Sequence, residues 1–362
     1  MADLRVDRDA VLRFRVRAQQ LDRPGSHPDA RVLDLGVQDT GPDGHRWALV
    51  VRGAEPDPGD LVLAWTLRGA PHAYRRSEAA GVAAATAPLS EADAAKRVFD
   101  AARPLAAAGI PVLDALARVS AQLRDVVGRR EVVKGEVSAA LTERLDPPYL
   151  RWCQPCRATH LYEQPFRLAA LPAGLELGAG TSPPVLRRIP GWRGPAKRVP
   201  GHLEPIRALL RLLGPTTPKA VAAYLDAPVK DVRAHWPADV VPVEVDGTRL
   251  GILEEDADAL TGADRPRGVR LLGPFDLFLQ GRDRELVVPD ASARQDLWRT
   301  LGRPGGLLVG SELVGSWRPR SSGRTLRLAV SVWDGGVPPA GLDEQAERLA
   351  AFRGQAFAGF VD

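Results

Sequence analysis

The sequence predicts a helix-rich α+β protein, in which tandem winged-helix (helix-turn-helix) motifs are followed by a strand-rich C-terminal domain. Three observations predict this fold class. Amphipathic helical segments are followed twice by a pair of apolar strands, at residues 61–74 and 240–256. In the second case three short helical segments precede a hairpin whose turn is Asp246-Gly247, a typical hairpin dipeptide. Strand patterns then dominate residues 306–333.

Each element has a local reason in the sequence. Asp7 can cap a helix that continues with apolar residues at helical spacing, and Pro24-Gly25 follows its end. Gly214-Pro215 ends another helix, and Pro218 stands in the first turn of the next one, where its missing N–H costs nothing. From such signals we predict helices at 7–21, 29–38, 90–108, 112–127, 131–145, 161–170, 203–213, 218–225, 228–236, 290–301 and 342–354. Residues 44–52 are a further apolar segment, helix or strand, for which we favour a helix. The predicted strands are the hairpins at 61–74 and 240–256 and the segments 149–153, 306–310, 313–318 and 325–333.

These elements predict five consecutive parts. Residues 1–88 form a first winged helix, which carries the polar residues discussed below. Residues 89–177 form a second and less regular winged unit. Residues 178–201 are rich in Pro and Gly and are basic, which indicates a linker or an exposed loop. Residues 202–262 form a third winged helix, and residues 263–362 form the C-terminal domain.

Composition excludes several classes of protein. The chain has 362 residues, enough for two or three domains, and 44% of them are hydrophobic. It has 49 basic and 45 acidic residues, a net charge of +4, which permits binding to nucleic acid. The basic residues are nearly all arginine, whose planar fork suits phosphates and base edges. The lysines are Lys96, Lys134, Lys197, Lys219 and Lys230.

The chain also lacks the marks of secretion, of membrane insertion and of nucleotide binding. Two cysteines, Cys153 and Cys156, cannot build a disulfide framework and suit a reducing cytosol. The N-terminus mixes acids with apolar residues and has no signal-peptide pattern. No apolar run reaches the roughly 18 residues of a membrane span. Neither a phosphate-binding loop nor a dinucleotide fingerprint occurs. We therefore expect a cytoplasmic protein without a nucleotide cofactor. We also expect a monomer, because its repeated units can pack on one another.

Three polar side chains in a row, Gln38, Asp39 and Thr40, separate two apolar segments within residues 32–52. Such a triplet is costly if it is buried without partners. The residues alone favour a helix C-terminus with ordinary turn chemistry. The alternative is a carboxylate and an amide held at the mouth of a groove, where they act on a substrate.

The chain resembles a known family in several segments. These are RAQQLDRP (17–24), DLGVQDT (34–40), LAWTLRGAPH (63–72), RWCQPCRATHLYEQPFRLAALPAGLEL (151–177), LLGPFDLFLQGRDR (271–284) and LVGSWRPR (313–320). Together they resemble the winged-helix DNA glycosylases of the AlkZ/YcaQ type. The resemblance implies three tandem winged helices, a C-terminal β-rich domain and duplex DNA as the partner. It also implies excision of alkylated bases or unhooking of crosslinks, with no metal or other cofactor.

The family's catalytic pair is a Gln, an apolar residue and then a Gln or Asp, and it matches this chain in two registers. If Gln38 is the first Gln, Thr40 takes the second position and Asp39 the apolar one. If Asp39 is the catalytic acid, Val37 replaces the Gln. The resemblance implies Asp39 as general base or electrostatic stabiliser, Gln38 as the residue that orients water, and Thr40 as a weaker substitute. Because the pair is altered in both registers, a DNA-binding winged-helix protein without catalysis remains the alternative.

Further residues are candidates for contacts with DNA or with a metal. The candidates for DNA contact are His72, Arg188, Arg193, Lys197, Arg198, Arg282, Trp317, Arg318 and Arg320. The alternative for His72 is a histidine in a turn. The alternative for the basic residues between 188 and 198 is a solvated linker. The alternative for Arg282, Arg318 and Arg320 is an ordinary arginine on the surface. Cys153-x-x-Cys156 with His160 has donors that suit zinc. A fourth ligand is not evident, so we expect this half-site to be structural and expect no metal.

Overall fold

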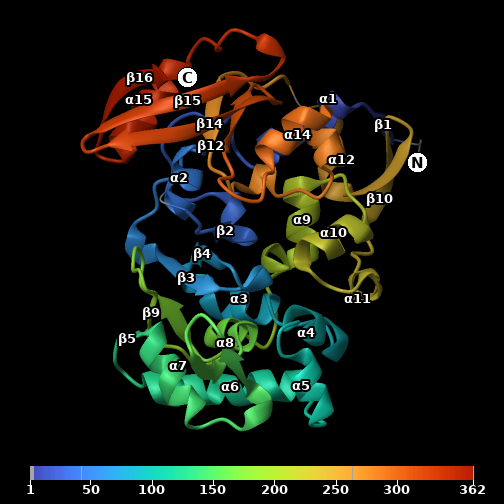
Figure 1. The fold of residues 1–362 in the computed structure, drawn as a ribbon. Coiled ribbons are helices and arrows are strands. Elements are labelled where there is room, and N and C mark those ends of the chain that lie inside the picture. Colours follow the sequence, from blue (N-terminus) through green and yellow to red (C-terminus); the bar gives the residue numbers. More distant parts are fainter. Residues whose placement is uncertain (1–3, 42, 263, 362) are drawn as a thin grey trace. The chain divides into compact units, whose positions relative to one another are not determined.

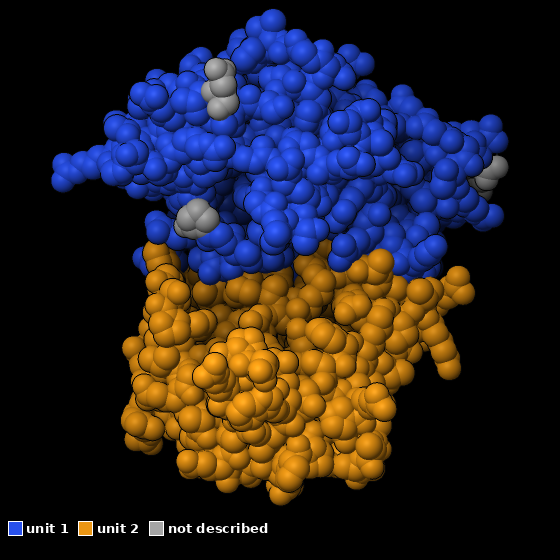
Figure 2. All heavy atoms as spheres, in the orientation of Figure 1, with its two compact units in different colours: residues 1–57, 207–221, 237–362 blue, residues 58–206, 222–236 orange. Residues whose placement is uncertain are grey.

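The computed structural model describes residues 4–41, 43–262 and 264–361, which form two compact units. Unit 1 contains residues 1–57, 207–221 and 237–362, and unit 2 contains residues 58–206 and 222–236 (Figure 2). Both units are therefore discontinuous in sequence. Two of the four boundaries fall within the helices α9 (Pro205–Leu213) and α10 (Pro218–Leu225). No helix among the described residues is long and apolar enough to cross a membrane.

Unit 1 contains the N-terminal helices and all of the C-terminal strands. Its helices are α1 (Arg8–Ala18), α2 (Gly44–Val50), α12 (Ala257–Gly262), α13 (Arg284–Val287), α14 (Ala291–Leu297) and α15 (Leu342–Phe352). Its strands are β1 (Leu4–Val6), β2 (Val37–Gln38), β10 (Val240–Val245), β11 (Thr248–Leu253), β12 (Val269–Leu272), β13 (Gly305–Val309), β14 (Glu312–Ser322), β15 (Thr325–Val332) and β16 (Ala356–Val361).

Two sheets organise unit 1. Strands β12 to β16 form a five-stranded sheet in sequence order, antiparallel except for the parallel pair β15–β16 (Figure 1). Strands β1, β10 and β11 form a smaller sheet, in which β10 and β11 are joined by the predicted turn. Asp246 and Gly247 both have positive φ, 46° and 79°, as a turn matched to the twist of a hairpin requires.

The N-terminal segment is part of the C-terminal core. Leu12, Val16 and Trp47 belong to the same buried cluster as Leu271, Trp317 and the apolar face of α15. The indole Nε1 of Trp47 donates to the carbonyl of Leu271 at 2.7 Å. Residues 1–57 therefore fold with residues 237–362, and the segment expected to form the first winged helix is divided at Asp57.

Unit 2 is mainly helical. Its helices are α3 (Ala79–Ala85), α4 (Glu91–Arg97), α5 (Ala102–Ala107), α6 (Val112–Val127), α7 (Lys134–Thr142), α8 (Glu163–Ala170) and α11 (Val229–Ala234). Its strands are β3 (Leu61–Trp65), β4 (Pro71–Arg75), β5 (Val132–Val133), β6 (Leu150–Cys153), β7 (Ala158–Leu161), β8 (Leu175–Leu177) and β9 (Val185–Arg188). Hairpins β3–β4 and β6–β7 are antiparallel, and β9 lies between β5 and β8.

Most predicted elements are present, and the mixed α+β class is confirmed. The order of three helices followed by a hairpin occurs at residues 205–253. Docking of these elements as winged helices stays a prediction. The prediction of one helix over 90–108 is wrong, because α4 and α5 are separate.

Two other local predictions are corrected. Residues 29–38 are not one helix: a 3-10 turn (Arg31–Asp34) is followed by β2, because Gly36 has a φ of 90°. Residues 178–201 are not a simple linker, because β9 lies inside a sheet and Leu186 and Ile189 are buried.

Candidate active site

Gln38 is the last residue of β2, Asp39 and Thr40 follow it on the loop to α2, and all three are half-buried. The Gln38 amide nitrogen donates to Thr40 Oγ1 at 2.9 Å. Its carbonyl oxygen accepts from the Gln280 amide nitrogen at 3.0 Å. Both ends of the Gln38 amide are therefore held, which fixes its orientation at the edge of unit 1's core.

The carboxylate of Asp39 is held by His45, in the first turn of α2. Asp39 Oδ1 lies 2.9 Å from His45 Nδ1 and accepts the His45 backbone N–H at 3.2 Å. The second bond satisfies an N–H that the helix leaves unpaired, so Asp39 also caps α2. The His45 side chain is 10% exposed and that of Asp39 is 27% exposed, so the carboxylate remains accessible.

The two registers of the catalytic pair correspond to different hydrogen-bond partners in this loop. Gln38 and Thr40, two residues apart, are bonded to each other. Asp39 bonds to His45 instead. Val37 is only 4% exposed and belongs to the core, so it offers no polar group to a substrate. The polar groups gathered here are thus one carboxylate, one imidazole, one hydroxyl and two amides.

His45 and Gln280 were missed by sequence reasoning. His45 had a weak signal, since it follows Asp39 across a Gly-containing turn and stands at the start of an apolar helix. Gln280 had no signal in the sequence that could link it to the site, because it is 242 positions from its partner Gln38.

Gly44 leaves the space that the Asp39 carboxylate occupies. A Cβ at position 44 would lie 2.0 Å from Asp39 Oδ1, so that oxygen would have to move. For the base excision that the resemblance implies, with Asp39 as its catalytic acid, we predict that Gly44→Ala lowers the rate by about a hundredfold, the cost of misplacing a catalytic group by roughly 1 Å. Single-turnover kinetics on a DNA substrate measure this effect.

Gly41→Ala is the matched control, because it is in the same loop, has a φ of 84° and would place its Cβ in open space. Both variants should be less stable by about 1–2 kcal/mol, because an alanine in left-handed backbone conformation is strained. Only Gly44→Ala should lose activity. Equal activity of the two variants would contradict the placement of Asp39.

The loop that carries Gln280 is anchored by a buried ion pair. Asp276 accepts two bonds from Arg52, at 2.7 and 2.8 Å, and its Oδ1 also accepts the Phe278 N–H. Both partners are buried. The Gln280 amide also donates to the Phe275 carbonyl at 3.2 Å. The helix that follows the Asp39 loop and the Gln280 loop are therefore fixed to each other within unit 1.

Arginines gather next to this loop. Burial lowers the pKa of Arg303 to about 10, with a smaller contribution from the charges of Arg284 and Arg282. Arg284 stacks over Trp298 at 5.1 Å. A cavity of about 660 Å³ is lined by Arg282, Arg284, Arg294 and Trp298, with Asp283 and Glu285 among its other walls. Clustered guanidinium groups of this kind are suited to bind an anion such as a phosphate.

The predicted DNA-contact residues of unit 1 have different surroundings. Arg282 and Arg320 are exposed. Arg318 pairs with Asp296 at 2.9 Å, which compensates its charge. Trp317 is wrong as a surface contact, because it is 1% exposed and its Nε1 donates to the Leu272 carbonyl in the core.

In unit 2, Arg188, Arg193, Lys197 and Arg198 are exposed on the stretch that follows β8. His72 is wrong as a turn histidine and as an exposed contact. It lies within β4 and is 1% exposed. Its Nδ1 lies 3.1 Å from Thr66 Oγ1 and 2.9 Å from the Ala70 carbonyl.

Cys153, Cys156 and His160 come together on the hairpin β6–β7. The pKa of Cys153 is lowered to about 7, because the backbone N–H of Cys156 and then the His160 side chain stabilise its thiolate. The pKa of Cys156 is raised, because its thiol donates to Cys153 and lies beside the charge of that thiolate.

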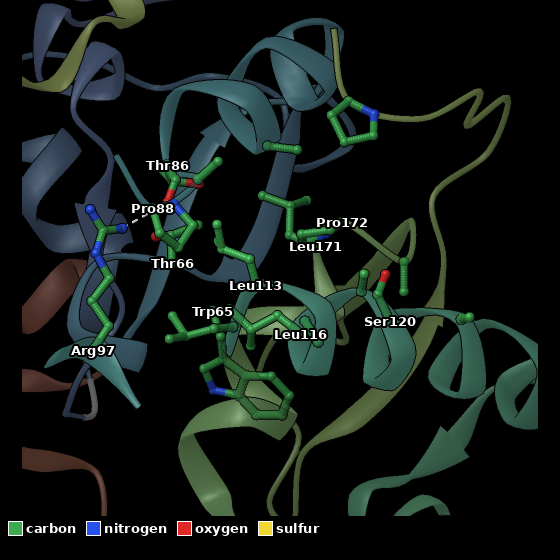
Figure 3. Close-up of a pocket in the computed structure, with 18 of the residues that line it drawn as sticks. Trp65, Thr66, Thr86, Pro88, Arg97, Leu113, Leu116, Ser120, Leu171 and Pro172 are labelled. Carbon is green, nitrogen blue, oxygen red and sulfur yellow. Dashed lines mark hydrogen bonds between the residues drawn. The ribbon is translucent and has the colours of Figure 1, made fainter. Parts of the chain in front are cut away.

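A separate cavity of about 400 Å³ in unit 2 holds none of the predicted residues (Figure 3). Its walls are largely apolar, including Trp65, Leu113, Leu116 and Leu171, with Arg97 at one side. Arg97 is bound to the Thr86 carbonyl and to Asp93, so its charge is compensated inside unit 2.

Comparison with known proteins agrees with the resemblance. The family model "DNA glycosylase AlkZ-like" matches residues 32–352, which include the Gln38 loop, the Gln280 loop and the cysteine hairpin. Streptomyces sahachiroi DNA glycosylase AlkZ has a similar fold, with a TM-score of 0.75 and 18% identity over 99% of this chain and 100% of that one. No curated protein sequence matches significantly. The chain therefore belongs to the AlkZ-like family of DNA glycosylases, which are hydrolases of N-glycosidic bonds.

Proposed function

We propose that this DNA glycosylase hydrolyses the N-glycosidic bond of alkylated purines in duplex DNA, including purines that carry bulky adducts or crosslinks. The observation that carries the proposal is the Asp39 carboxylate, which His45 holds one position along the chain from Gln38, the partner of Gln280. The same unit carries the arginine cluster. We further propose that the enzyme acts as a monomer in the cytoplasm, at the nucleoid.

The chemistry requires little more than this set of groups. N7 alkylation makes a purine a cationic leaving group, so the glycosidic bond is already weak. The sugar develops positive charge as this bond breaks, and a nearby carboxylate stabilises that charge. The same carboxylate can take a proton from the attacking water, and an amide can orient that water without taking its proton. Asp39 is assigned the first two roles and Gln38 the third.

The composition of the site favours hydrolysis by water, with no covalent intermediate on an amine. A glycosylase that also cleaves the strand uses an amine as nucleophile, which forms a Schiff base with the sugar. The five polar side chains gathered at the Asp39 loop include no lysine. We therefore propose a monofunctional enzyme, whose product is an abasic site in an intact strand.

The test is base release from three duplexes: unmodified, containing N7-methylguanine, and containing an interstrand crosslink between guanine N7 atoms. We expect release from the second and unhooking of the third, with no release from the first. Release of methylguanine alone would restrict the substrate class to small adducts. Binding without any release would contradict the proposal and favour a DNA-binding protein that has lost catalysis.

The arginine cluster predicts how DNA binding depends on salt. Each phosphate contact that is removed should make the slope of log K against log salt shallower by about 0.9 for duplex DNA. We therefore predict this change for Arg282→Ala, measured by fluorescence anisotropy over a range of salt concentrations. Arg118→Ala is the control, because Arg118 is exposed and already paired with Asp146 at 2.8 Å. Equal slopes for wild type and Arg282→Ala would remove this arginine from the DNA-contacting surface.

A further inference from the structure

The hairpin β6–β7 of unit 2 carries three side chains that commonly bind metals. Cys153 ends β6, Cys156 lies in the turn, and His160 is on β7, where it pairs with Arg151 across the hairpin. Cys153 and His160 are half-buried and Cys156 is exposed, so an ion can reach them from solvent. The catalytic proposal uses none of them.

The three donor atoms are already close together. The two sulfur atoms and a ring nitrogen of His160 all lie within 4.8 Å of one another. Around one tetrahedral zinc ion, with Zn–S bonds of about 2.3 Å and Zn–N bonds of about 2.0 Å, such atoms lie roughly 3.3–3.8 Å apart. The donors therefore need to approach by at most about 1.5 Å, which side-chain rotation supplies without unfolding the hairpin.

The hydrogen bonding of His160 prepares its ring for a metal. His160 Nδ1 lies 2.9 Å from the Leu161 carbonyl, which only accepts, so this nitrogen carries the proton. The lone pair is then on Nε2. Metal-binding histidines are oriented in this way, with the other ring N–H donated to a carbonyl or carboxylate.

The turn of the hairpin carries one residue of unusual backbone conformation next to the cysteines. Arg157, directly after Cys156, has a φ of 48°, in the left-handed region that a non-glycine residue rarely adopts. Arg157 is the last residue of the turn, and β7 begins at the next residue, Ala158. The two cysteines are three positions apart in the sequence, the spacing used by cysteine pairs that bind zinc, and the hairpin brings His160 close to both.

We propose that Cys153, Cys156 and His160 bind one Zn²⁺ ion. Two thiolates and an imidazole are soft and borderline donors that suit zinc rather than magnesium or calcium. On binding, each thiol gives its proton to solvent. Among the described residues the cluster has three ligands, so a water molecule or another external donor takes the fourth position. The ion closes the end of a two-stranded hairpin, and its role is structural.

The experiment uses the full chain, purified without a polyhistidine tag or chelator. Elemental analysis after gel filtration should find one zinc ion per chain. Zinc removal followed by Co²⁺ should produce thiolate-to-cobalt charge-transfer absorption. The double variant Cys153→Ser/Cys156→Ser should lose the zinc and the absorption, and His160→Ala should weaken both. His235→Ala, an exposed histidine of the same unit, is the matched control.

The outcomes separate zinc from the other chemistry of a cysteine pair. Thiols that react slowly with a thiol reagent until a chelator is added support the site. Wild-type protein without zinc, with no cobalt absorption and with thiols that react equally fast with or without added Zn²⁺, overturns it. A loss of two mass units in the freshly purified chain indicates a disulfide and overturns it as well. Should a variant fail to fold, the wild-type zinc and cobalt measurements still decide.

Discussion

Asp39→Asn is expected to lower the rate of base release from N7-alkylguanine duplex by a factor of about 10²–10⁴, the usual contribution of a general base. The reason is electrostatic as well as chemical. The amide carries no charge to stabilise the developing oxocarbenium ion, and it cannot accept the proton of the attacking water. Single-turnover measurements with enzyme in excess report the bond-breaking step directly.

The asparagine variant is chosen because it preserves the cap of α2. Its amide oxygen can still accept the His45 backbone N–H that Asp39 Oδ1 accepts now, and Asn is as good a cap as Asp. We therefore expect unchanged stability and DNA affinity. Asp39→Ala should in addition lose about 1 kcal/mol, the usual cost of a lost cap. Full activity of Asp39→Asn would exclude Asp39 as the base and would favour the register in which Gln38 and Thr40 are the catalytic pair.

Asp276→Ala is expected to lower the free energy of unfolding by about 3–5 kcal/mol, the usual cost of breaking a buried ion pair. The side chains of Arg52 and Asp276 are 1% and 0% exposed. Removing the carboxylate leaves a guanidinium in the core without its counter-charge. Because the chain has two compact units, urea unfolding followed by hydrogen exchange of the α2 amides is the appropriate measurement.

Asp146→Ala is the control for this prediction. Its pair with Arg118 has the same chemistry at 2.8 Å but is 48% and 62% exposed, so its loss should cost at most about 1 kcal/mol. Asp276→Asn should be milder than Asp276→Ala, since an amide can still accept from the guanidinium. A cost for Asp276→Ala no larger than that of Asp146→Ala would mean that the pair contributes little to unit 1.

Local signals in the sequence were sufficient for most elements. The Asp246-Gly247 turn was predicted because few dipeptides adopt positive φ twice, and the start of α1 was predicted from Asp7, which does accept from the Ala10 N–H. The family resemblance, carried by segments spread through the chain, is confirmed. The strand β16 was not predicted, because its pairing with β15 is a long-range parallel contact.

The candidate site was only half predictable. The polar triplet at residues 38–40 was visible, since it interrupts an apolar pattern. Its partner Gln280 was not, because it is 242 positions from Gln38. The Arg52–Asp276 pair, which anchors the Gln280 loop, likewise joins residues 224 positions apart. The sequence also did not show which of the candidate side chains are buried. Trp317 and His72 looked like surface contacts in sequence, yet both are enclosed by their units.

The discontinuity of unit 1 has a consequence for how the enzyme matures during synthesis. The ribosome releases residues 1–57 first, but their packing partners in residues 237–362 emerge last. Most of unit 2 is complete in between and can fold at once, since domains generally fold as units during synthesis. The first helices must therefore wait for these partners, and a chain arrested before residue 280 cannot form the bond between Gln280 and Gln38.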